Sequence, residues 1–63
     1  MGEITRKIKL FNQAYALAWE EVAKLPEGER RSAFLAAAIR SKISAGATDA
    51  NIIATEAIKI LTE

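Results

Sequence analysis

The chain has 63 residues, a formal net charge of +1, and neither cysteine nor histidine. A chain of this length makes one domain, which buries only about 60% of the surface that its unfolded form exposes and is marginally stable alone. The missing residue types exclude a disulfide and a structural zinc site. Because 51% of the residues are apolar, a second copy of the chain is the simplest way to cover the excess apolar surface.

The residue types that carry catalysis are absent or isolated, so we expect no enzyme, no cofactor and no metal site. The serines have no evident activating base, and the three glycines are too scattered to form a phosphate-binding loop. No apolar core follows the basic start of the chain, and the longest apolar run, residues 33–39, is far too short to cross a bilayer. We therefore expect a cytoplasmic protein with no membrane partner.

The first segment of the chain fits two patterns. Apolar and aromatic side chains recur at alternating steps of four and three, a heptad-like spacing that predicts one helix over residues 3–25. These side chains are Ile4, Ile8, Phe11, Tyr15, Ala18, Val22 and Leu25. Residues 5–10 also alternate between polar and apolar, which predicts a short strand, followed by a helix over residues 13–25 with Asn12 as its N-cap. We favour the strand, because cations in the first turns of a long helix oppose the helix macrodipole.

Two further helices are predicted, over residues 28–45 and 49–62. Pro26 separates the first of them from the preceding segment, because proline is poorly tolerated inside a helix. Gly46 suits a left-handed C-terminal cap, and Thr48 or Asp49 suits the N-cap of the last helix. The expected architecture is mainly α, a short N-terminal strand followed by three helices. The alternative is an all-α three-helix bundle.

The middle helix and the alternating segment together resemble the ribbon-helix-helix DNA-binding family over residues 5–43. The strongest match is a serine, paired apolar residues, an alanine-isoleucine-arginine triplet and a final apolar residue. It reads Ser32-x-Phe34-Leu35-x-x-Ala38-Ile39-Arg40-x-x-Ile43. Arg6 departs from the family, since the ribbon usually has an inward apolar residue there, and residues 47–63 would be an additional C-terminal helix.

The resemblance implies an intertwined homodimer whose two strands form one antiparallel ribbon in the DNA major groove. The residues that it implies as base contacts are Thr5, Lys7 and Lys9. The implied phosphate contacts, at the N-terminus of the second helix of the unit, are Arg30, Arg31 and Ser32. The implied dimer interface comprises Ile8, Leu10, Phe34, Leu35, Ala38 and Ile39.

Two functions follow from these patterns. The first is a small homodimeric DNA-binding protein, a transcriptional repressor or an antitoxin-type regulator, in which residues 47–63 bind a further protein. The second is an all-helical module for protein–protein interaction or oligomerisation, with no role in nucleic-acid binding. Exposed apolar side chains at Ile4 and Phe11 on one continuous helix would favour the second function.

Overall fold

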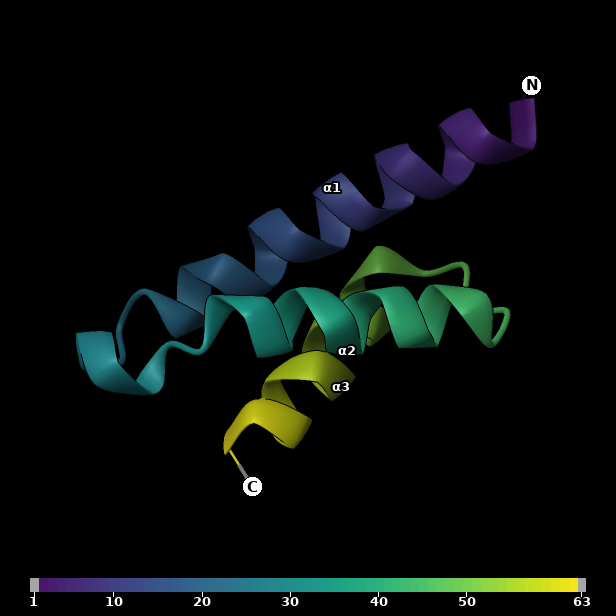
Figure 1. The fold of residues 1–63 in the computed structure, drawn as a ribbon. Helices are drawn as coiled ribbons and strands as arrows, with labels where there is room; N and C mark the ends of the chain where they lie inside the picture. Colours follow the sequence, from purple (N-terminus) through teal and green to yellow (C-terminus); the bar gives the residue numbers. More distant parts are fainter. Residues whose placement is uncertain (1, 63) are drawn as a thin grey trace.

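Three helices and one short 3₁₀ turn make up the fold in the computed structural model, which describes residues 2–62 apart from the side chain of Glu3. In chain order they are α1 (Gly2–Val22), the 3₁₀ turn η1 (Glu27–Glu29), α2 (Ser32–Ser44) and α3 (Ala50–Thr62). The molecule is elongated, 38 × 17 × 16 Å, because α1 is much longer than the other two helices (Figure 1). Within residues 2–62, no helix has both the length and the apolarity needed to cross a membrane.

The predicted N-terminal strand is wrong, because residues 5–10 lie inside α1 and the described part of the chain contains no strand. The all-α alternative agrees with the structure. Asn12 is therefore an exposed residue in the middle of a helix and not an N-cap. The heptad-like spacing over residues 3–25 prevails because it continues into side chains that are buried or partly buried from Phe11 onward, whereas the alternation at residues 5–10 falls on side chains that are almost all exposed.

The side chain of Arg30 caps the C-terminal end of α1 by hydrogen bonding to backbone carbonyls there. Its Nε donates a hydrogen bond to the Leu25 carbonyl at 3.1 Å, and its Nη2 donates one to the Ala23 carbonyl at 3.2 Å. Cationic side chains are favourable at a helix C-terminus because the last carbonyls have no partner in the helix and carry partial negative charge. Arg30 thus fixes the turn that leads through η1 to α2.

Both ends of the α2–α3 connection have the caps that the sequence predicts. Gly46 follows α2 with φ +103°, and the Ala47 amide donates to the Lys42 carbonyl at 3.1 Å, as in a glycine-terminated helix end. Asp49 Oδ1 accepts hydrogen bonds from the Asn51 amide at 2.9 Å and the Ile52 amide at 3.3 Å. Asp49, and not Thr48, is therefore the N-cap side chain of α3.

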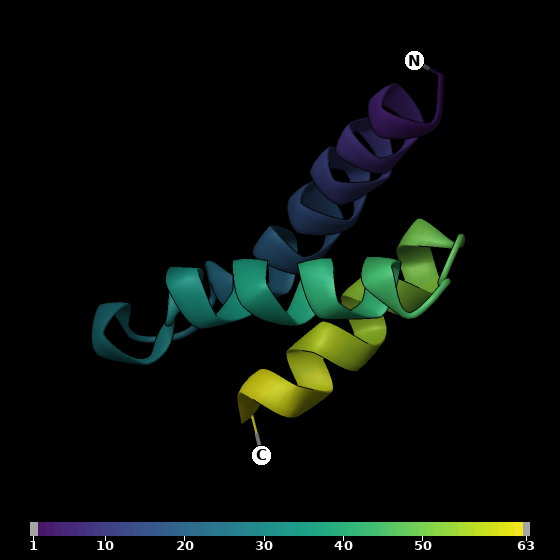
Figure 2. The same ribbon diagram turned by 45° about the vertical axis from the view of Figure 1, so that its right-hand side comes forward.

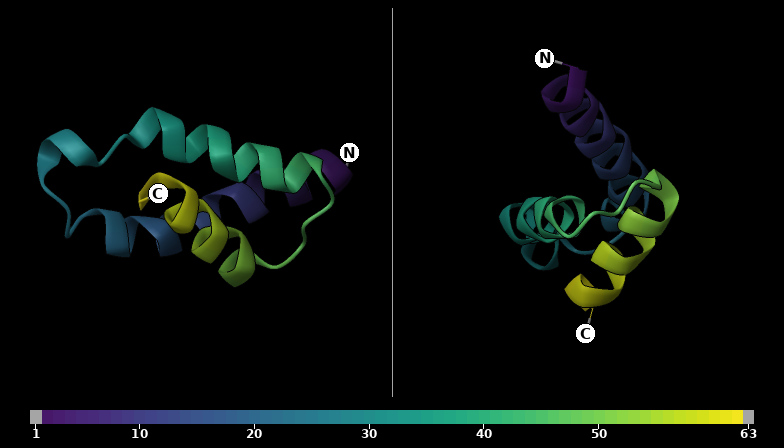
Figure 3. Two further views of the ribbon diagram at one scale, coloured as in Figure 1. Left: turned by 90° about the horizontal axis from the view of Figure 1, so that it is seen from below. Right: turned by 90° about the vertical axis from the view of Figure 1, so that its right-hand side faces the viewer.

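The three helices pack against one another (Figure 3), and the core lies between them. Each helix contributes side chains at helical spacing. The buried residues are Ala14, Ala18, Val22, Leu35, Ile39, Ile53, Ala54, Ala57 and Leu61. Alanines at these positions let the backbones approach closely, and no polar side chain in the described chain is buried. The ribbon through which two chains were expected to intertwine is not formed, because residues 5–10 are helical, and the homodimer itself stays a prediction.

Candidate interaction surface

An apolar ridge runs along α1 and extends beyond the other two helices. We call Ile4, Ile8, Phe11, Tyr15 and Trp19 the α1 ridge. Phe11, Tyr15 and Trp19 are partly buried against the core, whereas Ile8 is 57% exposed and Ile4 is 68% exposed. The ridge therefore becomes less covered toward the N-terminus, where the first turns of α1 rise clear of α2 and α3 (Figure 2). Large exposed apolar side chains that continue a buried row indicate a surface that is covered by something else.

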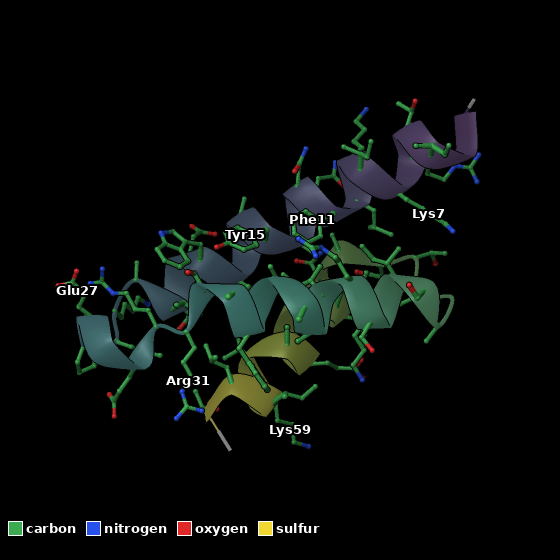
Figure 4. The ribbon with its side chains drawn as sticks, viewed as in Figure 1. Lys7, Phe11, Tyr15, Glu27, Arg31 and Lys59 are labelled. Carbon is green, nitrogen blue, oxygen red and sulfur yellow. The ribbon has the colours of Figure 1, made fainter. Side chains whose placement is uncertain are left out.

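The three aromatic side chains of the ridge form a continuous stack. The ring centroids of Phe11 and Tyr15 are 5.8 Å apart, and those of Tyr15 and Trp19 are 5.9 Å apart with an angle of 10° between the ring planes. Both distances lie in the range of favourable aromatic pairs. The spacing of four residues places the rings one above another on the helix, and Phe11 and Tyr15 lie on the side of α1 that adjoins α2 (Figure 4).

Arg40 of α2 lies across the end of this stack. Its guanidinium carbon is 5.6 Å from the centroid of the Phe11 ring, a distance that permits a cation–π interaction. Arg40 is exposed on its outer side, so the interaction contributes about 0.5–1 kcal/mol. It ties the C-terminal half of α2 to the ridge.

A shallow groove of about 430 Å³ lies between α1 and α2 beside Phe11. Ile8 and Phe11 form its α1 wall, and Ile43 forms the apolar part of its α2 wall. Lys7 and Arg40 stand at its edges, and none of the described residues that line it is acidic. A groove with apolar walls and cationic edges suits an amphipathic segment that brings carboxylates beside its apolar side chains.

The outer face of α2 carries small side chains. Ala33, Ala37 and Ser41 are exposed at steps of four, and Arg40 and Lys42 are the only charged residues among the 13 of this helix. A surface helix usually presents charged residues to water. The scarcity of charge on α2 means that little desolvation cost opposes a second helix beside it.

Few groups suited to covalent or metal chemistry lie near the groove in the described part of the chain. Among the side chains that the structure describes, no group of three or more acidic residues is placed to hold a metal ion. The groove contains one hydroxyl, from Ser44, and neither a carboxylate nor an imidazole to activate it.

The predicted base contacts do not share a face in the structure. Thr5, Lys7 and Lys9 are exposed on α1. On a helix, Thr5 and Lys9 lie near each other because they are four residues apart, whereas Lys7 is on the other side. In a ribbon all three would point the same way. DNA binding stays a prediction from the sequence, and the ribbon that was to carry it is not formed.

The predicted phosphate contacts flank the start of α2. Arg30 donates its hydrogen bonds to the Ala23 and Leu25 carbonyls, which directly follow α1. Arg31 is exposed and immediately precedes α2, in the left-handed conformation with φ 40° and ψ 53°. Ser32 is exposed at the first helical position. Of the three predicted phosphate contacts, Arg31 and Ser32 are therefore exposed to solvent, whereas the Arg30 side chain is used in hydrogen bonds to the backbone.

The residues predicted as a dimer interface are divided between the core and the surface. Leu35 and Ile39 are fully buried within the chain, Leu10 and Ala38 are partly buried, and Ile8 and Phe34 are exposed. Of these, Ile8 alone belongs to the α1 ridge. Sequence reasoning missed the α2 side of the groove, which Arg40 and Ile43 line, because their approach to α1 depends on how α2 packs.

No protein-family model matches the chain, and no curated protein and no solved structure matches it either.

Proposed function

We propose that this protein is a helical protein-interaction module that acts by association through the α1 ridge and the groove beside it. One observation carries the proposal: the row of side chains that packs α1 onto the core continues through Ile8 and Ile4, which are 57% and 68% exposed. Covering a large aliphatic side chain contributes about 1.5–3 kcal/mol relative to leaving it in water. A small chain gains from such cover because its own core is limited.

The cationic setting of the ridge supports association with a protein segment. Lys7 and Arg40 border the groove, so an apolar partner with acidic residues would satisfy both its walls and its edges. The groove is open and shallow, which suits a helix face more than an enclosed small molecule.

Site-specific photocrosslinking tests the proposal. A photoreactive amino acid replaces Ile8, and the control places it at Ile52, an equally exposed isoleucine on α3 (54% exposed). In cells that make the protein, we expect crosslinked protein products from position 8 and few from position 52. Equal yields from both positions, with both variants folded by circular dichroism, would overturn the proposal.

A further inference from the structure

We infer that the occupant of the α1 ridge is a second copy of this chain, with the two α1 helices packed antiparallel about a two-fold axis. This inference rests on the proposed function and names its partner. Four features of α1 carry it: the length of the ridge, the distribution of charge along the helix, the relation of that charge to the helix macrodipole, and the symmetry that the ridge allows.

The ridge has the dimensions of a helix–helix interface. Ile4 and Trp19 are 15 residues apart, so the ridge is about 22 Å long at a rise of about 1.5 Å per residue. Its steps of four and three are those of side chains that interlock between two helices. Its N-terminal half is aliphatic and uncovered, and its C-terminal half is aromatic and half-buried. Antiparallel pairing places the exposed isoleucines of each copy on the aromatic stack of the other.

Charge along α1 is divided between its two halves. Residues 2–11 contain Glu3, Arg6, Lys7 and Lys9, three positive charges and one negative, a net of +2. Residues 12–22 contain only Glu20 and Glu21, a net of −2. Lys24, just beyond the helix, offsets part of this through its ion pair with Glu21 at 3.4 Å. Parallel pairing would bring like halves together, whereas antiparallel pairing brings the basic half of each copy beside the acidic half of the other.

The same charges oppose the macrodipole of their own helix. Cations lie in the first turns of α1, and its last turn holds two glutamates and no basic residue, which is unfavourable at both ends. Lys7 and Ser44, the last residue of α2, line the same groove. The negative C-terminal end of α2 therefore lies near Lys7 and partly compensates its charge within the same chain. Lys9 and Glu20 are exposed. Where Ile4 of one copy packs on Trp19 of the other, the positive N-terminal end of α1 lies near Glu20 of the partner copy, and Lys9 lies opposite the uncharged middle of the helix.

Symmetry favours a second copy over a different protein. A two-fold interface needs a patch that is complementary to itself. The ridge meets this requirement in shape, aliphatic against aromatic, and in charge, basic against acidic. Its midpoint lies between Phe11 and Asn12, so the two-fold axis passes there.

Single cysteines test this arrangement cleanly, because the chain has none of its own. Asn12→Cys places a thiol beside the middle of the ridge, and Gln13→Cys places one on the opposite side of the helix. Both residues are exposed. With a short bis-maleimide at micromolar protein, we expect Asn12→Cys to give a covalent dimer at least about tenfold faster than Gln13→Cys, because only facing thiols lie within the linker's reach.

Sedimentation of the unmodified chain gives the second readout. We expect a concentration-dependent dimer that Ile8→Glu abolishes and Ile52→Glu leaves intact. Raising salt from 0.05 M to 1 M should weaken the dimer by up to about tenfold, because the facing charges are exposed and screened. A dimer that strengthens with salt would overturn the antiparallel arrangement.

The remaining outcomes separate this inference from the proposed function. A chain that stays monomeric at 1 mM overturns the second copy as occupant, and the photocrosslinks from position 8 then decide the proposed function alone. A dimer that is unaffected by Ile8→Glu and crosslinks equally through both cysteines overturns the inference by locating the contact elsewhere. If position 8 also yields no excess of photocrosslinks over position 52, the proposed function fails with it.

Discussion

Replacing Arg31 by glycine should stabilise the protein. Arg31 precedes α2 with φ 40° and ψ 53°, and its side chain makes no capping hydrogen bond. A left-handed conformation costs an L-residue other than glycine about 1–2 kcal/mol, because Cβ crowds the following carbonyl. The carbonyl of Arg31 accepts a hydrogen bond from the Leu35 amide at 2.9 Å, and the glycine variant keeps this backbone hydrogen bond.

The net gain is smaller than the strain that is removed. Glycine enlarges the unfolded ensemble, which costs about 0.4–1 kcal/mol relative to a residue with Cβ. Taken near the middle of each range, the two effects leave Arg31→Gly more stable by about 0.5–1 kcal/mol. For a domain of this size, 1 kcal/mol corresponds to about 4–8 °C in the melting temperature, so we expect a rise of about 2–8 °C.

Urea denaturation and thermal melts followed by circular dichroism measure this change. The matched control is Arg31→Ala. This variant also removes the charge and every side-chain atom beyond Cβ, but it keeps Cβ itself. All variants are compared at one protein concentration, because self-association would add to the apparent stability. A glycine variant no more stable than the alanine variant would refute the left-handed conformation at this position.

Three further substitutions test the packing and the capping by the same urea denaturation. Asp49→Ala should lower the free energy of unfolding by about 1 kcal/mol, because the α3 amides lose their cap; no loss would mean that Asp49 does not cap α3. Ile53→Ala should lower it by about 2–5 kcal/mol, since Ile53 is fully buried. That loss takes much of the total stability of about 3–9 kcal/mol expected for the chain, and a loss below about 1 kcal/mol would contradict the burial. Phe34→Gln should cost less than about 1 kcal/mol, because Phe34 is 48% exposed; a larger cost would show that Phe34 is covered in the folded protein.

The two shorter helices could be predicted from the sequence because burial and capping agree there. Gly46 and Asp49 mark the end of α2 and the start of α3 by local chemistry that does not depend on the rest of the fold. The predicted start of α2 at residue 28 was too early. The chain first forms η1 and turns through Arg31, whose left-handed conformation no residue preference predicts.

The N-terminal segment was misread because two periodicities coincide on exposed residues. Over six residues, Ile8 belongs to the helical pattern and also, together with Leu10, to an alternating one. The helical pattern prevails because it continues for three more turns, through Ala14, Ala18 and Val22, which are fully buried. The macrodipole penalty of the basic residues is a few tenths of a kcal/mol each, too little to end a helix that is held at its other end by the core.

Only part of the interaction surface could be read from the sequence. The spacing of Phe11, Tyr15 and Trp19 by four residues is visible in it and predicts that the rings share a side of a helix. The sequence does not show that Arg40 and Ile43 approach that side of α1. The same apolar residues of α2 could face inward at several rotations of α2 against α1. The groove is thus a property of the packed helices and not of any one segment.

The length of α1 connects its stability to its proposed role. Its 21 residues span about 31 Å, whereas the 13 residues of α2 and of α3 span about 20 Å each. The first turns of α1 therefore extend past the core and gain little from packing, and a short helical segment without packing is marginal in water. A partner helix on Ile4 and Ile8 would supply the missing burial, so association and the ordering of this end stabilise each other. Removing either isoleucine should consequently affect association far more than the core, since neither residue belongs to it.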